Sequence, residues 1–160
     1  MRIETLADCH EHIPQLAAWL HDEWGHLHDN DSVARRAARL EARATRGGIT
    51  IGFVAVDGDT LLGSASLVHD DLETRPDLGP WLASVYVAPE HRRKGVASAL
   101  VRRVVEEARA LDVSLLYLWT IDQERLYARL GWRTVERTAF RGHDIVIMAI
   151  EPGKAVEEVG

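Results

Sequence analysis

Cysteine is nearly absent from this sequence: Cys9 is the only one among 160 residues. No disulfide bond can form within the chain, so nothing in the sequence calls for an oxidising compartment. Long apolar runs are missing too. No stretch approaches the roughly 18 apolar residues of a membrane-spanning helix, and the first residues, MRIETLADCH, contain no apolar signal segment. We therefore expect a cytoplasmic protein that does not enter a membrane.

A surplus of basic residues is also missing. The chain has 25 acidic residues against 19 lysines and arginines, and its net charge is −6. A protein that binds nucleic acid needs a dominant basic face, so this balance argues against a nucleic-acid partner. With 46% hydrophobic and 28% charged residues, the composition is that of an ordinary globular protein. The length suits one domain, which we place at residues 1–150, followed by a polar tail at 151–160.

Repeats and low-complexity linkers are absent, and the chain instead alternates strand and helix patterns. We expect strands at 2–6, 49–56, 61–68, 81–90, 114–119, 132–140 and 143–150, and helices at 13–24, 33–44, 96–111 and 120–130. Asp57-Gly58-Asp59 between two β-rich runs predicts a hairpin. The order β-α-α-β-β-β-α-β-α-β-β predicts an α/β fold with a mixed sheet. The nearly continuous apolar run at 114–119 predicts a doubly buried strand, parallel to its predecessor across the intervening helix.

The helix expected at 33–44 has one apolar side, and Asp31 or Ser32 can cap its start. That side is lined by Val33, Ala37, Leu40 and Ala44. The charged residues Arg35, Arg36, Arg39, Glu41 and Arg43 fall largely on the other sides.

The chain is organised around residues 81–111, where a β-rich run passes directly into a helical pattern. The turn between them holds Arg92, Arg93, Lys94 and Gly95. The first N–H groups of a helix lack intrahelical partners and the helix dipole is positive there, so this end favours an anion. Cations are mildly unfavourable at a helix start unless an anion binds. The turn therefore predicts a phosphate- or pyrophosphate-binding site.

These residues resemble a known family. Arg92-Arg93-Lys94-Gly95-Val96-Ala97 fits the signature (Gln/Arg)-x-x-Gly-x-(Gly/Ala) of the GNAT superfamily of acetyl-CoA-dependent N-acetyltransferases. Further on, LYARLGW at 126–132 is similar to that superfamily's second marker, Tyr-x-x-x-Gly-Phe/Trp. The two markers occur in the family's order, and the resemblance covers about residues 1–150. It implies a mostly antiparallel, twisted sheet with a splayed strand pair, and acetyl-CoA as cofactor.

The resemblance also implies roles for single residues. The amides of the basic turn would hold the pyrophosphate of coenzyme A, and Val85 and Val87 would guide its pantetheine arm along the bulged strand. Tyr127 would be the general acid that returns a proton to the departing thiolate. The residues expected at the cofactor are Val85, Tyr86, Val87, Arg92, Arg93, Lys94, Gly95, Val96, Ala97, Ser98, Thr120, Gln123 and Tyr127.

The sequence departs from the family pattern at two places. Many relatives have Asn-x-x-Ala before the marker Tyr, where this chain has Thr120 and Gln123, a pair that reads as a capping box. Several relatives carry a glutamate on the bulged strand as catalytic base, and residues 81–86 contain no carboxylate. The base is therefore open among Glu23, His26, Ser84, Asp70 and Asp71. We take Glu23 and Ser84 forward as catalytic residues beside Tyr127.

Two further groups have alternative interpretations. The acidic loop at 69–80 is either a hydrophilic connector or an attractor for a cationic amine, through Asp70, Asp71, Glu73 and Asp77. The histidines at 21, 26 and 28 lie beside acidic residues, but their spacing is not specific for a metal, and we expect none.

The resemblance leads to a functional expectation: direct transfer of acetyl from acetyl-CoA to a primary amine of a small molecule or peptide. A non-catalytic acyl-CoA-binding module and a transferase for another acyl group stay as alternatives. The acceptor is not identified by the sequence, and a homodimer is the assembly that the family suggests.

Overall fold

The computed structural model describes residues 1–154. Its strands are β1 (Arg2–Thr5), β2 (Ile51–Asp57), β3 (Thr60–Val68), β4 (Trp81–Val87), β5 (Leu116–Thr120), β6 (Arg133–Phe140) and β7 (His143–Ile150). Its α-helices are α1 (Ile13–Trp24), α2 (Val33–Ala42), α3 (Val96–Ala110) and α4 (Glu124–Arg129), and its 3-10 helices are η1 (Leu6–His12), η2 (Gly25–Leu27) and η3 (Pro89–His91). The predicted order of strands and α-helices is confirmed.

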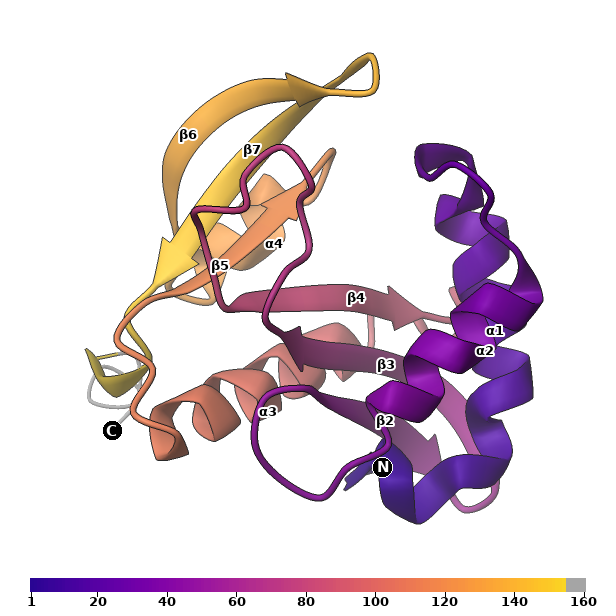
Figure 1. Ribbon diagram of the computed structural model, residues 1–160. Coiled ribbons are helices and arrows are strands. Elements are labelled where there is room, and N and C mark those ends of the chain that lie inside the picture. The colour runs from indigo at the N-terminus through magenta and orange to yellow at the C-terminus, as the bar shows by residue number, and fades with distance from the viewer. Residues whose placement is uncertain (155–160) are drawn as a thin grey trace.

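The strands form one 7-stranded sheet in the order β1-β2-β3-β4-β5-β7-β6 (Figure 1). Every neighbouring pair is antiparallel except β4 and β5, which are parallel and are joined through α3. The α/β fold with a mostly antiparallel sheet and one central crossover is therefore confirmed.

The helices cover the two faces of the sheet unequally. Helices α1 and α2 pack on one face of β2, β3 and β4 through a cluster that includes Leu16, Leu20, Val54 and Tyr86. Helix α3 covers the other face with a wide apolar side that reaches β2, β3 and β4. Between β5–β7 and the loop after β3, a third cluster contains Leu72, Trp81, Phe140 and Ile147. The loops around the β4–β5 junction are thus fixed by apolar contacts as well as by the sheet.

Strands β4 and β5 pair only at their beginning. Trp81 and Tyr117 are the one register pair between them within residues 1–154, and the Tyr117 N–H donates to the Pro80 carbonyl at 3.0 Å. Beyond this pair the strands diverge, as Figure 1 shows. Strand β4 also carries a bulge, because its register with β3 shifts between Ser64 and Ser66, and Ser84 has a φ of 54°. We call the diverging region the strand opening. It confirms the splayed pair that the resemblance implied.

Some local expectations were wrong. The segment 120–130 is not one helix, because Thr120 is the last residue of β5 and α4 begins at Glu124. Strand β5 alternates between buried and half-buried residues and is not buried on both faces. On α2, Val33 is 42% exposed while Arg36 is only 5% exposed. Arg36 and Arg43 lie four residues before and three after Leu40, so they share its inward side.

No helix in the described part of the chain is both long and apolar enough to cross a membrane. Of the tail expected at 151–160, the structure describes only the first residues, where 152–154 form a helical turn, and the remainder lies outside the described residues.

Candidate active site

The turn before α3 presents free backbone donors. Gly95 is the N-cap of α3 with a φ of 81°, and no side chain caps the helix there. Arg93 has a φ of 64°, so two residues of the turn lie in the left-handed region that lets successive amides point to the same side. Arg93, Lys94 and Gly95 are exposed, while Val96 is buried and anchors the first turn. The backbone therefore forms a concavity of free N–H groups at a helix start, a geometry that suits an anion.

The cationic side chains of this turn differ in what they contact. Arg92 folds back along β4: its Nε donates to the Val87 carbonyl at 2.8 Å, and its guanidinium lies 5.7 Å from the centre of the Tyr86 ring. Arg92 therefore ties the turn to the strand. Arg93 and Lys94 are exposed, and they are the cations of this turn that are left to meet an anion.

The strand opening begins beside this turn. The side chains of Val85 and Val87 pack on the α3 side of the sheet, so the backbone of β4 is what faces the diverging β5. Tyr86 points to the other face, where its ring lies 5.6 Å from that of Trp19 and 6.1 Å from that of Trp24. Ala97 and Ser98 are half-buried in the first turn of α3.

Tyr127 lies on α4, which follows β5. It is 7% exposed, and its ring packs edge-on against Trp132 at 6.1 Å. Burial, with a smaller effect of Asp122, raises the pKa of the Tyr127 hydroxyl above its ordinary value, so the hydroxyl stays protonated and is a hydrogen-bond donor. At the end of β5, the Thr120 hydroxyl accepts a bond from the Gln123 N–H at 3.0 Å. Gln123 Nε2 donates to Asp122 instead of returning to Thr120, and the N-cap of α4 is Gln123, without a side-chain cap, so the expected capping box is wrong.

The bulge of β4 is held by an arginine from α2. Arg43 Nη1 donates to the Ser84 hydroxyl at 3.1 Å and to the Ser66 hydroxyl at 3.2 Å. Burial lowers the pKa of Arg43, and no carboxylate within residues 1–154 lies inside the 4.0 Å of an ion pair with it. Because the Ser84 oxygen accepts from a cation, it is a poor proton acceptor and its own O–H is left to donate. Arg43 is a residue that the sequence analysis placed on an outer side of α2.

Asp71 lies on the other side of the strand opening. The loop after β3 carries it over β5, where the Trp119 indole N–H donates to the Asp71 backbone carbonyl at 3.3 Å. Burial raises the pKa of the Asp71 carboxyl to about 7, against the lowering effects of Arg43, of Trp119 and of two more arginines of α2. Asp71 was one of five open candidates for the base, and the arginine that acts most strongly on its carboxyl, Arg43, is the one that contacts Ser84.

Most other carboxylates of the neighbouring loops are neutralised by arginines. Glu73 pairs with Arg141 at 2.8 Å, and Asp77 pairs with Arg75 at 3.0 Å. These pairs favour the connector interpretation of the acidic loop over the interpretation in which all four of its carboxylates attract an amine. The same Arg141, at the tip of the β6–β7 hairpin, also pairs with Asp29 at 3.0 Å. One side chain therefore joins three segments above the opening.

The remaining sequence candidates lie apart. Glu23 is exposed at the end of α1, where its charge acts on Tyr86, and Asp70 is exposed. His26 is exposed and its ring stands 6.0 Å from that of His143. His21 Nδ1 lies 2.6 Å from a carboxylate oxygen of the buried Asp31. No group of three or more metal-ligating side chains occurs in residues 1–154.

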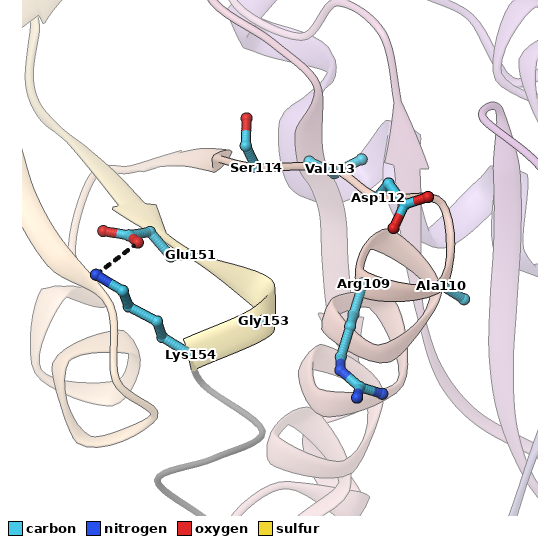
Figure 2. A pocket seen from close by; sticks show the side chains of 8 residues that line it. All are labelled: Arg109, Ala110, Asp112, Val113, Ser114, Glu151, Gly153 and Lys154. Atoms are coloured by element: carbon cyan, nitrogen blue, oxygen red, sulfur yellow. Dashed lines mark ion pairs between the residues drawn. The ribbon is translucent and has the colours of Figure 1, made fainter.

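A surface hollow of about 730 Å³ lies far from these residues (Figure 2). It is lined by Arg109, Ala110, Asp112, Val113, Ser114, Glu151, Gly153 and Lys154. Lys154 pairs with Glu151 at its edge, at 3.1 Å. The hollow lies at the C-terminal end of α3, while the anion-binding turn lies at its N-terminal end. A helix of 15 residues separates them by about 22 Å, so the hollow has no part in the site.

Comparison with known proteins agrees with this geometry. The family model described as the acetyltransferase (GNAT) family matches residues 13–132. Among solved structures, a ribosomal-protein-alanine N-acetyltransferase from Brucella melitensis has a TM-score of 0.75 at 20% identity, covering 94% of this chain and 99% of its own. An aminoglycoside 6'-acetyltransferase type Ii has a TM-score of 0.73 at 20% identity, covering 95% and 97%. An aminoglycoside 6'-N-acetyltransferase complexed with coenzyme A has a TM-score of 0.70 at 17% identity, covering 95% and 97%.

At these identities the structural likeness shows the fold. No curated protein sequence matches the chain.

Proposed function

The chain belongs to the acetyltransferase (GNAT) family, and we propose that it transfers acetyl from acetyl-CoA to a primary amine of a small molecule or peptide, by direct attack in a ternary complex. One observation carries this proposal. Strands β4 and β5 pair only at Trp81 and Tyr117, so β4 has an unpaired backbone edge that leads to the uncapped start of α3, and the buried Tyr127 follows β5. These are the parts that a thioester donor and an amine acceptor need.

The residues of the turn suit the pyrophosphate of coenzyme A. The uncapped amides from Gly95 to Ala97 supply neutral donors, and the exposed Arg93 and Lys94 supply charge. A solved relative of the same fold is a complex with coenzyme A. The unpaired edge of β4 at Val85 and Val87 supplies backbone groups for the amides of an extended arm. When bound, acetyl-CoA supplies a thioester carbonyl that an amine can attack.

Direct transfer is supported by the position of the single thiol. Cys9 is 8% exposed and packs in the cluster beneath α1, and burial raises the pKa of its thiol. A thiol that is buried and protonated is a weak nucleophile, and Cys9 belongs to the 3-10 helix after β1, at the far edge of the sheet from the strand opening. The acceptor amine itself is therefore the nucleophile that we propose.

Three residues have proposed roles in the chemistry. The Tyr127 hydroxyl donates a hydrogen bond or its proton to the departing thiolate. Ser84 donates its O–H within the opening, since its oxygen already accepts from Arg43. Glu23, exposed beside Tyr86, is placed to attract a cationic acceptor toward the opening. This role replaces the role of base that the sequence analysis considered for it.

Release of free coenzyme A thiol tests the proposal. The purified chain is incubated with acetyl-CoA and a panel containing n-butylamine, glycine, a dipeptide and kanamycin, and thiol is measured against reactions without amine. We expect amine-dependent release with at least one member, and mass spectrometry should find the acetamide. Tight binding of acetyl-CoA with no release across a broad panel would support a non-catalytic acyl-CoA-binding module instead. Replacing acetyl-CoA by propionyl- or succinyl-CoA in the same assay tests the acyl group.

A further inference from the structure

The proposed transfer needs a group that takes a proton from the acceptor. An alkylammonium ion has no free electron pair, so it cannot attack the thioester until it loses a proton. The group must lie at the strand opening and must be free of a permanent ion pair. It must also titrate near the pH at which the enzyme works. Strand β4 itself has no carboxylate.

Most carboxylates around the opening fail the second requirement. Glu73, Asp29 and Asp77 are paired with arginines. Asp31 is paired with Arg36 at 3.0 Å and with His21. Each of these carboxylates already interacts with a cationic side chain. The pKa values of Asp29, Asp31 and Asp77 are lowered. These carboxylates are weak proton acceptors at neutral pH.

Asp71 meets the positional requirement. Its backbone is attached to β5 through Trp119 at 3.3 Å, and the charge acting most strongly on its carboxyl is Arg43. Arg43 in turn contacts the bulge of β4 at Ser84. The Asp71 backbone is therefore attached to β5 at the opening, and its carboxyl lies within the electrostatic influence of the arginine that holds β4, without forming an ion pair with it.

Asp71 also meets the chemical requirement. Burial raises the pKa of its carboxyl to about 7, and no arginine within residues 1–154 forms an ion pair with it. The charged groups that act on it are Arg36 and Arg39 from α2 and Arg43 from the C-cap of that helix, and Trp119 acts on it from β5 as a neutral donor. These groups lower its pKa and keep burial from raising it further. The carboxyl can therefore both accept and release a proton near neutral pH.

We propose that Asp71 is the general base of the transfer. Its carboxylate takes one proton from the acceptor ammonium, and the nitrogen then forms a C–N bond to the thioester carbonyl carbon. The C–S bond breaks and its electron pair leaves on sulfur. The second proton lost by nitrogen ends on that sulfur, beside the Tyr127 hydroxyl, and Asp71 returns its proton to solvent. The products are an amide, a thiol and one released proton.

This inference rests on the proposed function, and the experiment separates the two. The acceptor is the amine of the panel that wild-type enzyme acetylates fastest, and kcat/KM for that amine is measured between about pH 5.5 and about pH 9. The variants are Asp71→Asn, Asp70→Asn at the exposed neighbouring carboxylate, and Asp59→Asn, which makes the same change at the distant β2–β3 turn. Acetyl-CoA affinity is measured for each by calorimetry.

We expect Asp71→Asn to lower kcat/KM about 100-fold or more, to lose the limb that rises near pH 7, and to keep wild-type acetyl-CoA affinity. Asp59→Asn should match wild type. If Asp70→Asn loses the rise of kcat/KM near pH 7 and Asp71→Asn keeps it, the assignment of Asp71 as the general base is overturned. If wild type releases no thiol with any amine, the proposed function itself has failed.

A second measurement does not depend on turnover. The aspartate side-chain carboxyls are labelled with carbon-13 and titrated by NMR in wild type and in Asp71→Asn. One resonance should titrate close to neutral pH and be missing from the variant. If the Asp71 carboxyl titrates in the ordinary range of an aspartate, near pH 4, the proposal is overturned.

Discussion

The guanidinium of Arg43 joins the end of α2 to the bulge of β4, because its Nη1 donates to the Ser84 hydroxyl at 3.1 Å across 41 positions of the sequence. The same nitrogen donates to Ser66 on β3, so one cation fixes the place where the register between β3 and β4 shifts. It does so without a carboxylate partner inside the 4.0 Å of an ion pair within residues 1–154. Its charge acts on Asp71 across the strand opening.

Replacing Arg43 by glutamine should therefore change the pH profile as well as the rate. Without the strongest lowering effect on the Asp71 pKa, the limb near pH 7 should move to higher pH, and the loss of two hydrogen bonds should cost about 1–3 kcal/mol of stability. Arg39→Gln is the matched control on the same helix, since Arg39 is 46% exposed and acts on Asp71 more weakly. Equal shifts in the two variants would contradict a specific role for Arg43. Stability is measured by denaturant unfolding.

The residues expected at the cofactor could be predicted from the sequence because the motifs that indicate them are contiguous. The run from Arg92 to Ala97 combines a turn, its cations and a helix start within a few positions, and the marker at 126–132 spans the end of the short helix α4 and the turn after it. The order of strands and helices followed from apolar periodicity in the same way. Local patterns of this kind need no knowledge of which distant segments meet.

The residues on the acceptor side of the site could not be predicted from contiguous motifs. Arg43, Ser84 and Asp71 come from α2, β4 and the loop after β3, and their proximity depends on how a helix end meets a bulge. One signal was available but was not used: Arg36 and Arg43 lie four residues before and three after the apolar Leu40, and this helical spacing would have placed both arginines on the inward side. The protonation behaviour of Asp71 depends on burial by segments far apart in sequence, which no spacing encodes.

The cations of the turn should differ in their effect on cofactor binding. Arg93→Ala and Lys94→Ala should weaken acetyl-CoA binding several-fold and reduce its dependence on salt, because both side chains are exposed at an anion-binding helix start. Arg92→Ala should instead lower thermal stability, since its Nε donates to the Val87 carbonyl. Calorimetric titration at two salt concentrations measures the first effect and thermal unfolding the second. A uniform loss of affinity across the three variants would contradict this division.

Tyr127→Phe should lower kcat and leave acetyl-CoA affinity nearly unchanged. The ring stays in its contact with Trp132, and only the hydroxyl that donates to the leaving thiolate is lost. The expected loss in kcat is about 10- to 100-fold. Burial holds the hydroxyl protonated, so the loss should be similar at all pH values at which Asp71 is ionised. An unchanged kcat in the variant would remove Tyr127 from the chemistry.

Arg141→Ala should act on the acceptor and not on the cofactor. Its guanidinium joins the hairpin tip to Asp29 and Glu73, and these ion pairs are exposed, so the loss of stability should be about 1 kcal/mol or less. Separating the three segments should change KM for the acceptor several-fold while acetyl-CoA affinity stays constant. Arg46→Ala, which removes an exposed pair with Asp8, is the control. If both variants changed KM alike, the effect would not come from the segments above the opening.

Asp71 should make the folded protein less stable as the pH rises. Its pKa is about 7 in the folded state against 3.8 for the free side chain. The folded state therefore binds more protons than the unfolded state between these values, and the free energy of unfolding must fall as pH increases across that range and level off above it. The loss is on the order of a few kcal/mol, and Asp71→Asn should abolish it.

Urea unfolding at about pH 5 and about pH 8 measures the effect. The variant should gain stability relative to wild type at the higher pH and gain little at the lower pH, where Asp71 is already protonated. If the variant and wild type differed in free energy of unfolding by the same amount at both pH values, the Asp71 carboxyl would not titrate between them. Burial that destabilises the carboxylate also raises its affinity for a proton. A catalytic base that titrates at neutral pH therefore comes with a cost to the stability of the fold.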